Sequence, residues 1–307
     1  MTVQLAPAGV LATGEGSGRG ARRNARAESL VSLGFVAPTW IFMLAVGLIP
    51  IGYAVWLSFT DLGLYSDGTR FVGFENYVEA VFTPRFLGTL ATTLIFVIAG
   101  LVVQFVFGYL LASALHRQLR GFQIARTVLL IPMLLTPVVV GLIWQFMFNP
   151  DLGIINAVLG VAGIDVNFFG DSLLARGLVV LVDAWMHIPF VMLMLVAAMA
   201  GVSDEPLEAA ALDGAGWWQT TRYIVLPVIA PVIMITLIVR CIDIMRIFDV
   251  VFTTTRGGPG TSTETVSMLS YATTFQFYEF SQGAAMSVAL AVLMFPVYFL
   301  YIRLTKV

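Results

Sequence analysis

Residues 86–115 read FLGTLATTLIFVIAGLVVQFVFGYLLASAL, and no charged side chain interrupts the stretch between Arg85 and His116. Each helical residue rises about 1.5 Å, so about 20 apolar residues cross the hydrocarbon core of a bilayer. Lipid offers no hydrogen-bond partner to backbone N–H and C=O groups, and a helix satisfies these groups internally. The stretch is therefore predicted to be a transmembrane helix.

Five further segments have similar length and composition. They lie between Glu28 and Asp61, between Arg126 and Asp151, from about Leu174 to Gly201, from about Val228 to Val251, and between Glu279 and Arg303. The alternating pattern of a membrane β-barrel is absent from them. Only 11% of the 307 residues are charged, whereas soluble domains average about 25%. We therefore predict an all-α integral membrane protein with six transmembrane helices.

Several functions are excluded by what the chain lacks. A P-loop needs a lysine in a GxxxxGK[ST] motif, but the only lysine, Lys306, is second from last and follows no glycine-rich loop. Neither HExxH nor GxSxG occurs, so we predict that this chain is not an enzyme. With a net charge of -2 and a single cysteine, Cys241, the chain offers no basic surface for nucleic acid and no Cys-based metal site.

Basic residues gather on one side of the predicted spans. They are Arg19, Arg22, Arg23 and Arg26 before the first span, Arg117, Arg120 and Arg126 after the second, and Arg303 with Lys306 at the end. The positive-inside rule then places both termini in the cytoplasm. Residues 1–28 are rich in Gly, Ala and Arg without apolar periodicity, so we predict a disordered cytoplasmic tail that can touch anionic lipid. Residues 29–307 form the predicted six-span domain.

On this topology, the longest internal cytoplasmic loop is residues 201–227, GVSDEPLEAAALDGAGWWQTTRYIVLP. Pro206 suits the first turn of a helix, and Glu205 and Glu208 favour its positive N-terminal end. Gly214 is placed to stop this helix. A second short helix is predicted from Gly216 to Ile224, before Pro227 opens the next span. The simplest alternative is an ordinary solvated linker.

Motifs in this loop resemble the EAA signature of ABC-importer permeases. They are Glu208-Ala209-Ala210, Asp213-Gly214-Ala215 and Leu226-Pro227. The resemblance implies the type I ABC-importer permease architecture. It also implies that these six residues, Glu208 to Ala210 and Asp213 to Ala215, couple the chain to a cytoplasmic ATPase subunit, because the loop forms the coupling helices in that family.

Other motifs are similar to the carbohydrate-uptake branch of the family, the maltose and glycerol-phosphate type. They are Gly73-Phe74-Glu75-Asn76-Tyr77, the segment from Pro132 to Asn156 with Trp144 and Gly153, and Gly257-Gly258-Pro259 followed by Thr263-Glu264-Thr265. The resemblance runs from about residue 30 to the end, and within this branch the chain looks like a trehalose-importing permease of actinobacteria. The chain lacks the large extra periplasmic domain of the maltose permease.

The resemblance implies a sugar importer of the bacterial cytoplasmic membrane, moving a disaccharide such as trehalose. Its expected partners are a second homologous permease, two ATPase subunits and an extracytoplasmic sugar-binding lipoprotein. ATP and Mg are expected on the ATPase, and no cofactor on this chain. The rival reading is an ion-coupled secondary transporter in which Asp183 and His187, four residues apart, relay protons. His187 could instead bond a backbone carbonyl freed by Pro189.

Charged residues in the fourth and fifth spans need partners or a wet cavity, because each costs at least about 2.5 kcal/mol near mid-bilayer. A rise of about 1.5 Å per residue places Asp183 at the same depth in the membrane as the segment from Arg240 to Arg246. A cross-helix ion pair is therefore possible. The charges at 240, 243, 246 and 249 alternate in sign and can also pair along one helix. They are interpreted either as a strip packed against the partner permease or as part of the translocation path.

Sugars present hydroxyls to polar side chains and apolar faces to aromatic rings. The predicted substrate-path residues are Asp183, His187, Trp144, Gln145, Asn149, Arg240, Asp243, Arg246 and Phe248, with Trp185 as a further aromatic candidate. For each aromatic residue, lipid contact or core packing is the alternative. Pro132, Pro137 and Pro189 are predicted to bend or loosen their helices.

Overall fold

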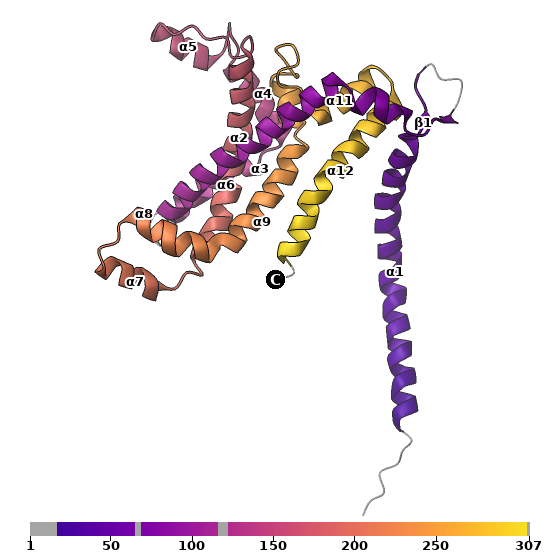
Figure 1. Ribbon diagram of the computed structural model, residues 1–307. Helices are drawn as coiled ribbons and strands as arrows, with labels where there is room; N and C mark the ends of the chain where they lie inside the picture. The colour runs from indigo at the N-terminus through magenta and orange to yellow at the C-terminus, as the bar shows by residue number, and fades with distance from the viewer. Residues whose placement is uncertain (1–16, 65–68, 116–121, 306–307) are drawn as a thin grey trace, which may run out of the picture. The chain divides into compact units, whose positions relative to one another are not determined.

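The computed structural model describes residues 17–64, 69–115 and 122–305, and the chain divides into two compact units, Met1–Ala54 and Val55–Val307. Helix α1 (Ser17–Leu57) accounts for the described part of the first unit (Figure 1). It includes residues 17–28, which the sequence predicts as disordered, and their Ala and Arg residues are strong helix formers. The rest of the predicted tail, and Arg117, Arg120 and Lys306, lie outside the described residues.

The second unit holds a short antiparallel pair, β1 (Thr60–Asp61) and β2 (Arg70–Phe71), in which Thr60 faces Phe71. Its helices, with π-helical turns marked η, follow in chain order. They are η1 (Tyr77–Val81), α2 (Pro84–Leu115), α3 (Phe122–Leu134), α4 (Pro137–Met147), α5 (Ile154–Val161), α6 (Ser172–Met199), α7 (Asp204–Leu212), α8 (Trp217–Thr220), η2 (Thr221–Val225), α9 (Leu226–Met245), α10 (Asp249–Thr254), α11 (Val266–Tyr271), η3 (Ala272–Gln276) and α12 (Phe280–Thr305).

Five helical segments among the described residues are long and apolar enough to cross a membrane. They are Val36–Leu57, Pro84–Leu115, Ser172–Met199, Trp217–Met245 and Phe280–Leu304. Counting the broken pair Thr127–Leu134 and Pro137–Met147, bent by 99°, as one more span gives the predicted six. The break falls at Pro137, as predicted, because a residue before proline is disfavoured in the helical conformation and Thr136 is extended. Pro189, in contrast, lies within the continuous α6.

The fifth span differs from its predicted bounds at both ends. It begins at Trp217, so the second short helix expected in loop 201–227 runs directly into the membrane helix. The π-helical turn η2 precedes Pro227, whose ring clashes with the preceding turn of a regular α-helix. At the other end α9 stops at Met245, and α10 is a separate helix rather than the continuation predicted to Val251.

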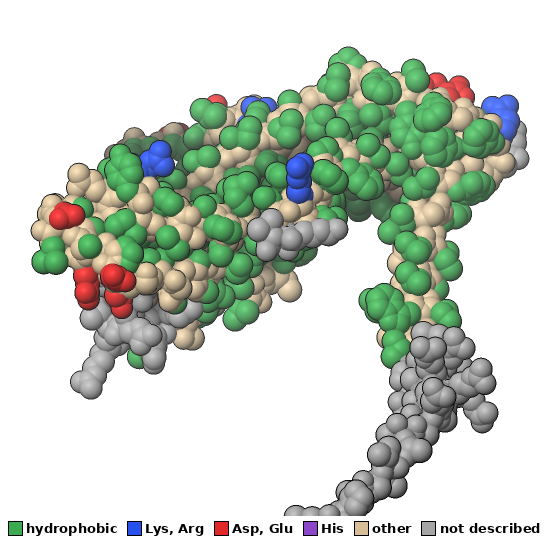
Figure 2. Space-filling view, turned by 60° about the horizontal axis from the view of Figure 1, so that its bottom comes forward, with side chains coloured by type: hydrophobic (Ala, Val, Ile, Leu, Met, Phe, Trp, Pro, Cys, Tyr) green, Lys and Arg blue, Asp and Glu red, His purple; other side chains and the backbone are tan. Residues whose placement is uncertain are grey.

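Helices α2, α6 and α9 pack against one another and form the centre of the second unit. Gly108 lets α2 approach α6 closely, because a Cβ there would lie 2.7 Å from Val191 Cγ1. One apolar cluster surrounds Phe96, Val182 and Ile244, and a second surrounds Ala112, Met192 and Ile229. Hydrophobic side chains are also spread over the whole face visible in Figure 2, as expected for lipid contact.

Candidate functional site

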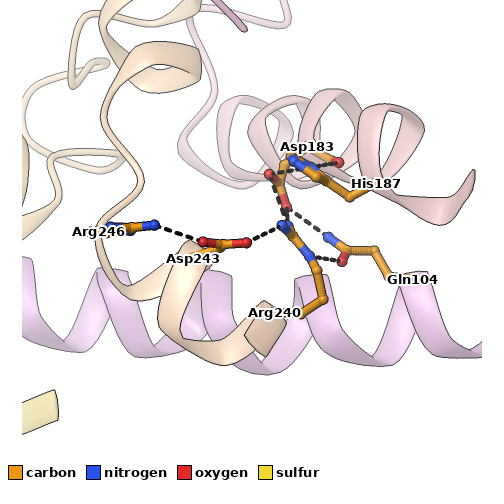
Figure 3. Close-up of polar contacts among 6 residues, drawn as sticks. All are labelled: Gln104, Asp183, His187, Arg240, Asp243 and Arg246. Carbon is orange, nitrogen blue, oxygen red and sulfur yellow. Dashed lines mark hydrogen bonds and ion pairs between the residues drawn. The ribbon is translucent and has the colours of Figure 1, made fainter. Parts of the chain in front are cut away.

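A buried polar group occupies the layer between the two apolar clusters, where α2, α6 and α9 each contribute one side chain (Figure 3). Arg240 donates from Nη2 to Asp183 Oδ2 at 3.2 Å and from Nε to Gln104 Oε1 at 2.8 Å. Gln104 in turn donates from Nε2 to Asp183 Oδ2 at 2.7 Å. All three are buried: Arg240 is 1% exposed, Asp183 is 5% exposed and Gln104 is 0% exposed. They form a closed triangle of hydrogen bonds.

A row of ion pairs extends from Arg240 toward the surface. Arg240 Nη1 donates to Asp243 Oδ2 at 3.2 Å, and Arg246 Nη2 donates to Asp243 Oδ1 at 2.9 Å. Side-chain exposure rises along this row from 2% at Arg240 to 38% at Asp243 and 62% at Arg246. The row therefore leads from the core of the bundle to its surface. The cross-helix ion pair is as predicted, and so is the pairing at three-residue spacing for Arg240, Asp243 and Arg246. Asp249 does not continue the row on the same helix, because it begins the separate α10.

His187 attaches to the same carboxylate from one turn along α6. Its Nδ1 lies 3.0 Å from Asp183 Oδ1 and 2.9 Å from the backbone carbonyl oxygen of Asp183. That carbonyl is not the one that Pro189 frees, which belongs to residue 185, four positions earlier. The proposed bond of His187 to the carbonyl freed by Pro189 is therefore wrong, although a backbone bond does exist.

The local sequence explains why these groups meet. Gly100, Gln104 and Gly108 recur every four residues on α2 and so share one helix face. A Cβ at Gly100 would lie 3.0 Å from Ile244 Cδ1 and 3.8 Å from Asp183 Oδ2. The glycines thus bring α2 close enough for the Gln104 amide to reach both charged partners. Sequence reasoning missed Gln104, because a single uncharged polar residue barely alters hydropathy.

The charges of the group balance. Two arginines face two aspartates, with the neutral amide of Gln104 beside them, so these four charges sum to zero. Burying an ion pair is costly unless hydrogen bonds satisfy its remaining donors and acceptors. Arg240 directs three of its nitrogens to protein partners. Its side chain therefore joins helices, whereas Asp243 and Arg246 retain exposed atoms that can meet another molecule.

The remaining predicted path residues lie apart from this group. Trp144 stacks on Phe148 with ring centroids 5.6 Å apart and meets Trp185 edge-on at 5.7 Å, which joins α4 to α6. Asn149 caps the following turn, because its Oδ1 accepts from the N–H groups of residues 151 and 152. Gln145 is half-buried on α4.

Phe248 stands between α9 and α10, immediately after the break. Its ring lies 5.2 Å from that of Phe252 and 5.0 Å from that of Tyr271. The backbone of the break is held from α11, because Thr265 donates to the carbonyl of Ile247 at 3.0 Å. An aromatic group and the exposed Arg246 thus flank the same interruption of the helix.

The predicted coupling residues form a well-defined helix end. Glu208, Ala209 and Ala210 lie in α7, and Asp213 is its C-cap. Gly214 has φ +72, a conformation that glycine adopts without steric cost. The N–H of Ala215 donates to the carbonyl of Ala210 at 2.9 Å, and the N–H of Gly214 to that of residue 211 at 3.2 Å. These two bonds make a Schellman motif, so Gly214 stops the helix as predicted.

No group of His, Cys, Asp and Glu in the described ranges is arranged to hold a metal ion.

Comparison with known proteins identifies the class. Residues 104–307 match the family of binding-protein-dependent transport system inner membrane components. The trehalose transport system permease SugA of Mycobacterium tuberculosis is 33% identical over 279 residues, covering 91% of this chain and 89% of the relative. A probable ABC transporter permease of Sinorhizobium fredii is 32% identical over 268 residues, 87% of each chain.

Among solved structures, a bacterial ABC transporter that imports the acidic polysaccharide alginate contains a chain of the same fold. The TM-score is 0.79 at 21% identity, over 94% of this chain and 99% of that chain. The chain therefore belongs to the binding-protein-dependent transport family, and it is a multi-pass inner-membrane permease subunit of an ABC importer. Such subunits carry no ATPase site of their own, and a separate subunit hydrolyses ATP.

Proposed function

We propose that this chain is one of two unlike permease halves of an importer that moves a disaccharide, with trehalose as the first candidate, into the cytoplasm. The similarity to the trehalose permease SugA over nine-tenths of the chain supports this substrate class. On the cytoplasmic side, two ATPase subunits that bind ATP and Mg complete the transporter. A sugar-binding lipoprotein delivers the substrate outside.

The loop at residues 201–227 is the proposed coupling site, and the surface of α7 and α8 carries this proposal. Leu212 is 90% exposed and Trp218 is 66% exposed. Large apolar side chains at the end of a membrane bundle favour a protein partner over water. The rigid stop at Gly214 fixes the turn between α7 and α8. We assign the ATPase contact to Glu208–Ala210 and Asp213–Ala215.

The proposed orientation has both termini in the cytoplasm. Within the second unit, α7, α8 and the C-terminal end of α12 lie at one end, and α5 and α11 lie at the other (Figure 1). Arg303 lies in the last turn of α12, at the end that carries α7. The positive-inside rule makes this the cytoplasmic end, so α5 and α11 face outward.

The substrate path is proposed to pass the break between α9 and α10. Interrupted helices near the bilayer midplane supply binding groups in many transporters, because the break exposes polar backbone where a cavity can solvate it. Here Asp243 and Arg246, which bond to each other, offer a carboxylate and a guanidinium, and Phe248 offers a ring two residues further along the chain. Arg240 holds Asp243 in place through a hydrogen bond, and Asp183 and His187 support Arg240 from α6. Trp144 and Gln145 on α4 and Asn149 in the turn after it form the outer approach.

Reconstitution tests the proposal. The chain, co-expressed with its partner permease and ATPase, is purified as a complex and placed in liposomes with the binding protein. We expect accumulation of labelled trehalose that requires ATP on the side of the membrane that carries the ATPase. Maltose and sn-glycerol 3-phosphate serve as competing substrates, because the sequence resembles both types of permease. Competition by sn-glycerol 3-phosphate alone would overturn the disaccharide assignment.

The same preparation separates the importer from the secondary transporter. Uptake driven by a proton gradient in the absence of ATP would favour the secondary transporter. The His187→Gln variant removes the proposed proton relay while keeping a polar side chain. If transport is ATP-driven, this variant should retain its dependence on ATP and remain insensitive to dissipation of the proton gradient.

A further inference from the structure

A polar cavity lies apart from the buried triangle of Gln104, Asp183 and Arg240. Its volume is about 480 Å³, and its walls include Arg85, Phe252, Arg256, Glu264, Gln276 and Phe277. These residues come from the start of α2, from α10 and the turn after it, and from the end of η3. Arg85 precedes Gln104 on α2 by 19 positions, a separation of roughly 28 Å along a helix. A small molecule bound at Arg85 therefore does not reach the buried triangle of Gln104, Asp183 and Arg240.

The polar groups of this cavity are fixed in place. Arg85 donates two hydrogen bonds to Glu264, from Nη2 to Oε1 at 2.9 Å and from Nε to Oε2 at 3.3 Å. The side chain of Glu264 is only 9% exposed, whereas that of Arg85 is 51% exposed. The buried carboxylate of Glu264 thus holds the guanidinium of Arg85 in place, and the remaining N–H groups of that guanidinium face the cavity. Bidentate pairs of this kind hold a planar group in one orientation.

Arg256 is held in an unfavourable backbone conformation. Its φ is 52, and Tyr278, which follows the cavity residue Phe277, has φ 61. In the described part of the chain these are the two residues other than glycine with positive φ. The N–H of Arg256 donates to the carbonyl of Val251 at 2.8 Å, which closes the end of α10. Glycine is the usual residue at such a position.

The turn that carries Arg256 is tied together by side-chain bonds. Thr263 Oγ1 donates to the carbonyl of Gly258 at 2.9 Å and lies 2.7 Å from Thr255 Oγ1. The guanidinium of Arg256 nevertheless has no hydrogen-bond or ionic partner among the described residues and is exposed. A strained residue whose side chain has no partner within the fold is typical of a functional site, so we take the Arg256 guanidinium as a group that meets a ligand.

We propose that this cavity is a sugar-binding station at the outer end of the permease, distinct from the buried triangle around Arg240 and adjoining the break between α9 and α10, because Phe252 on its wall stacks on Phe248. The assignment rests on the proposed function, because it takes the sugar as the transported molecule. The guanidinium groups of Arg85 and Arg256 and the amide of Gln276 supply hydrogen bonds to hydroxyls. The rings of Phe252 and Phe277 cover an apolar sugar face. The volume lies within the range of about 300–1,000 Å³ typical of small-molecule sites.

Cysteine protection tests the station in the assembled importer. The single cysteine, Cys241, is replaced by serine, and Leu142→Cys places a thiol on the cavity wall without removing a polar group. The complex, without binding protein, is treated with a maleimide in the presence of the sugar that the same preparation transports. We expect the sugar to slow labelling severalfold, and an equal concentration of sorbitol to leave it unchanged.

Two glycine substitutions separate binding from folding. Arg256→Gly removes the guanidinium and suits the left-handed backbone, so it should abolish protection while the melting temperature stays equal or rises. Tyr278→Gly makes the same backbone change at a side chain outside the cavity, so protection should persist. Normal ATP-driven uptake with no protection of Leu142→Cys, or protection that survives Arg256→Gly, would overturn the station. Absence of any sugar uptake would instead overturn the proposed function.

Discussion

Arg240 Nη2 lies 3.2 Å from Asp183 Oδ2, and this ion pair joins α9 to α6 where the two apolar clusters meet. The two residues are 57 positions apart in the chain and both are buried. Gln104 contacts each of them from α2. Three helices therefore share one closed polar group, and removal of any member takes a hydrogen-bond partner from each of the other two in an apolar environment.

The first prediction concerns the carboxylate. Asp183→Asn keeps the shape of the side chain but removes the buried countercharge of Arg240 and leaves it only the partly exposed Asp243. Breaking a buried ion pair from one side costs about 3–5 kcal/mol, so the complex should melt at a markedly lower temperature. Tryptophan fluorescence of the purified permease pair during heating measures this loss.

Two further variants serve as controls for this prediction. Asp243→Asn should cost less than about 1 kcal/mol, because its carboxylate is 38% exposed. The double variant Asp183→Asn with Arg240→Gln removes both buried charges, so it should recover much of the lost stability. A double variant as unstable as the sum of its single changes would show that the two side chains do not interact.

The second prediction concerns the contact of α2 with α6. A Cβ at Gly108 would lie 2.7 Å from Val191 Cγ1 and 3.3 Å from the backbone N of Met192. Gly108→Ala should therefore force the helices apart at a cost of about 1–3 kcal/mol. Gly88→Ala on the same helix meets nothing within 4 Å, and it should be neutral or slightly stabilising. Thermal unfolding of both variants gives the comparison.

Adding Val191→Ala to Gly108→Ala checks the cause. The smaller side chain frees the space that the new methyl group needs, so the double variant should regain stability relative to Gly108→Ala. Equal instability of the single and double variants would assign the effect to the backbone of α6 instead.

Much of this architecture follows from the sequence because hydropathy and proline act locally. Long apolar runs predict the spans, and Pro137 predicts the break between α3 and α4. The level of Asp183 relative to Arg240 follows from counting residues along two helices that cross the same bilayer. Gly214 marks the end of α7 because a left-handed residue there favours glycine.

Other features depend on tertiary contacts and are not visible in a hydropathy profile. Gln104 is uncharged, and its role depends on three helices meeting. The end of α9 at Met245 interrupts a run that was predicted to continue to Val251, because contacts with α11, such as the bond from Thr265 to Ile247, hold the break. The cavity beside Arg256 depends on a strained turn whose conformation local propensity argues against.

The third prediction concerns coupling. Gly214 has φ +72, and a Cβ added there would meet nothing within 4 Å, so alanine is strained by its backbone conformation alone. That strain is about 1–2 kcal/mol, enough to fray or reorient the end of α7 without unfolding the bundle. Gly214→Ala should therefore leave the permease pair assembled but lower the ATP hydrolysis that substrate stimulates. Hydrolysis and uptake are measured on the same proteoliposomes.

Gly201→Ala is the control for coupling, because Gly201 lies in the same loop without a positive φ and with only the carbonyl oxygen of Ala198 nearby, at 3.4 Å. It should retain both activities. Full coupling in Gly214→Ala would remove the assignment of this helix end to the ATPase contact.

The fourth prediction separates the buried and exposed arginines of α9. Arg246 has a side chain that is 62% exposed and bonds to Asp243, whereas Arg240 is buried among three partners. Arg246→Ala should leave the melting temperature and assembly unchanged. If its guanidinium bonds to sugar hydroxyls, uptake should fall by roughly tenfold, the loss of one hydrogen bond to a charged group. Arg240→Ala should instead destabilise the complex. Dissociation of the two permeases by Arg246→Ala, with uptake lost for that reason, would assign Arg246 to the partner interface, because a side chain that contacts substrate alone has no part in assembly.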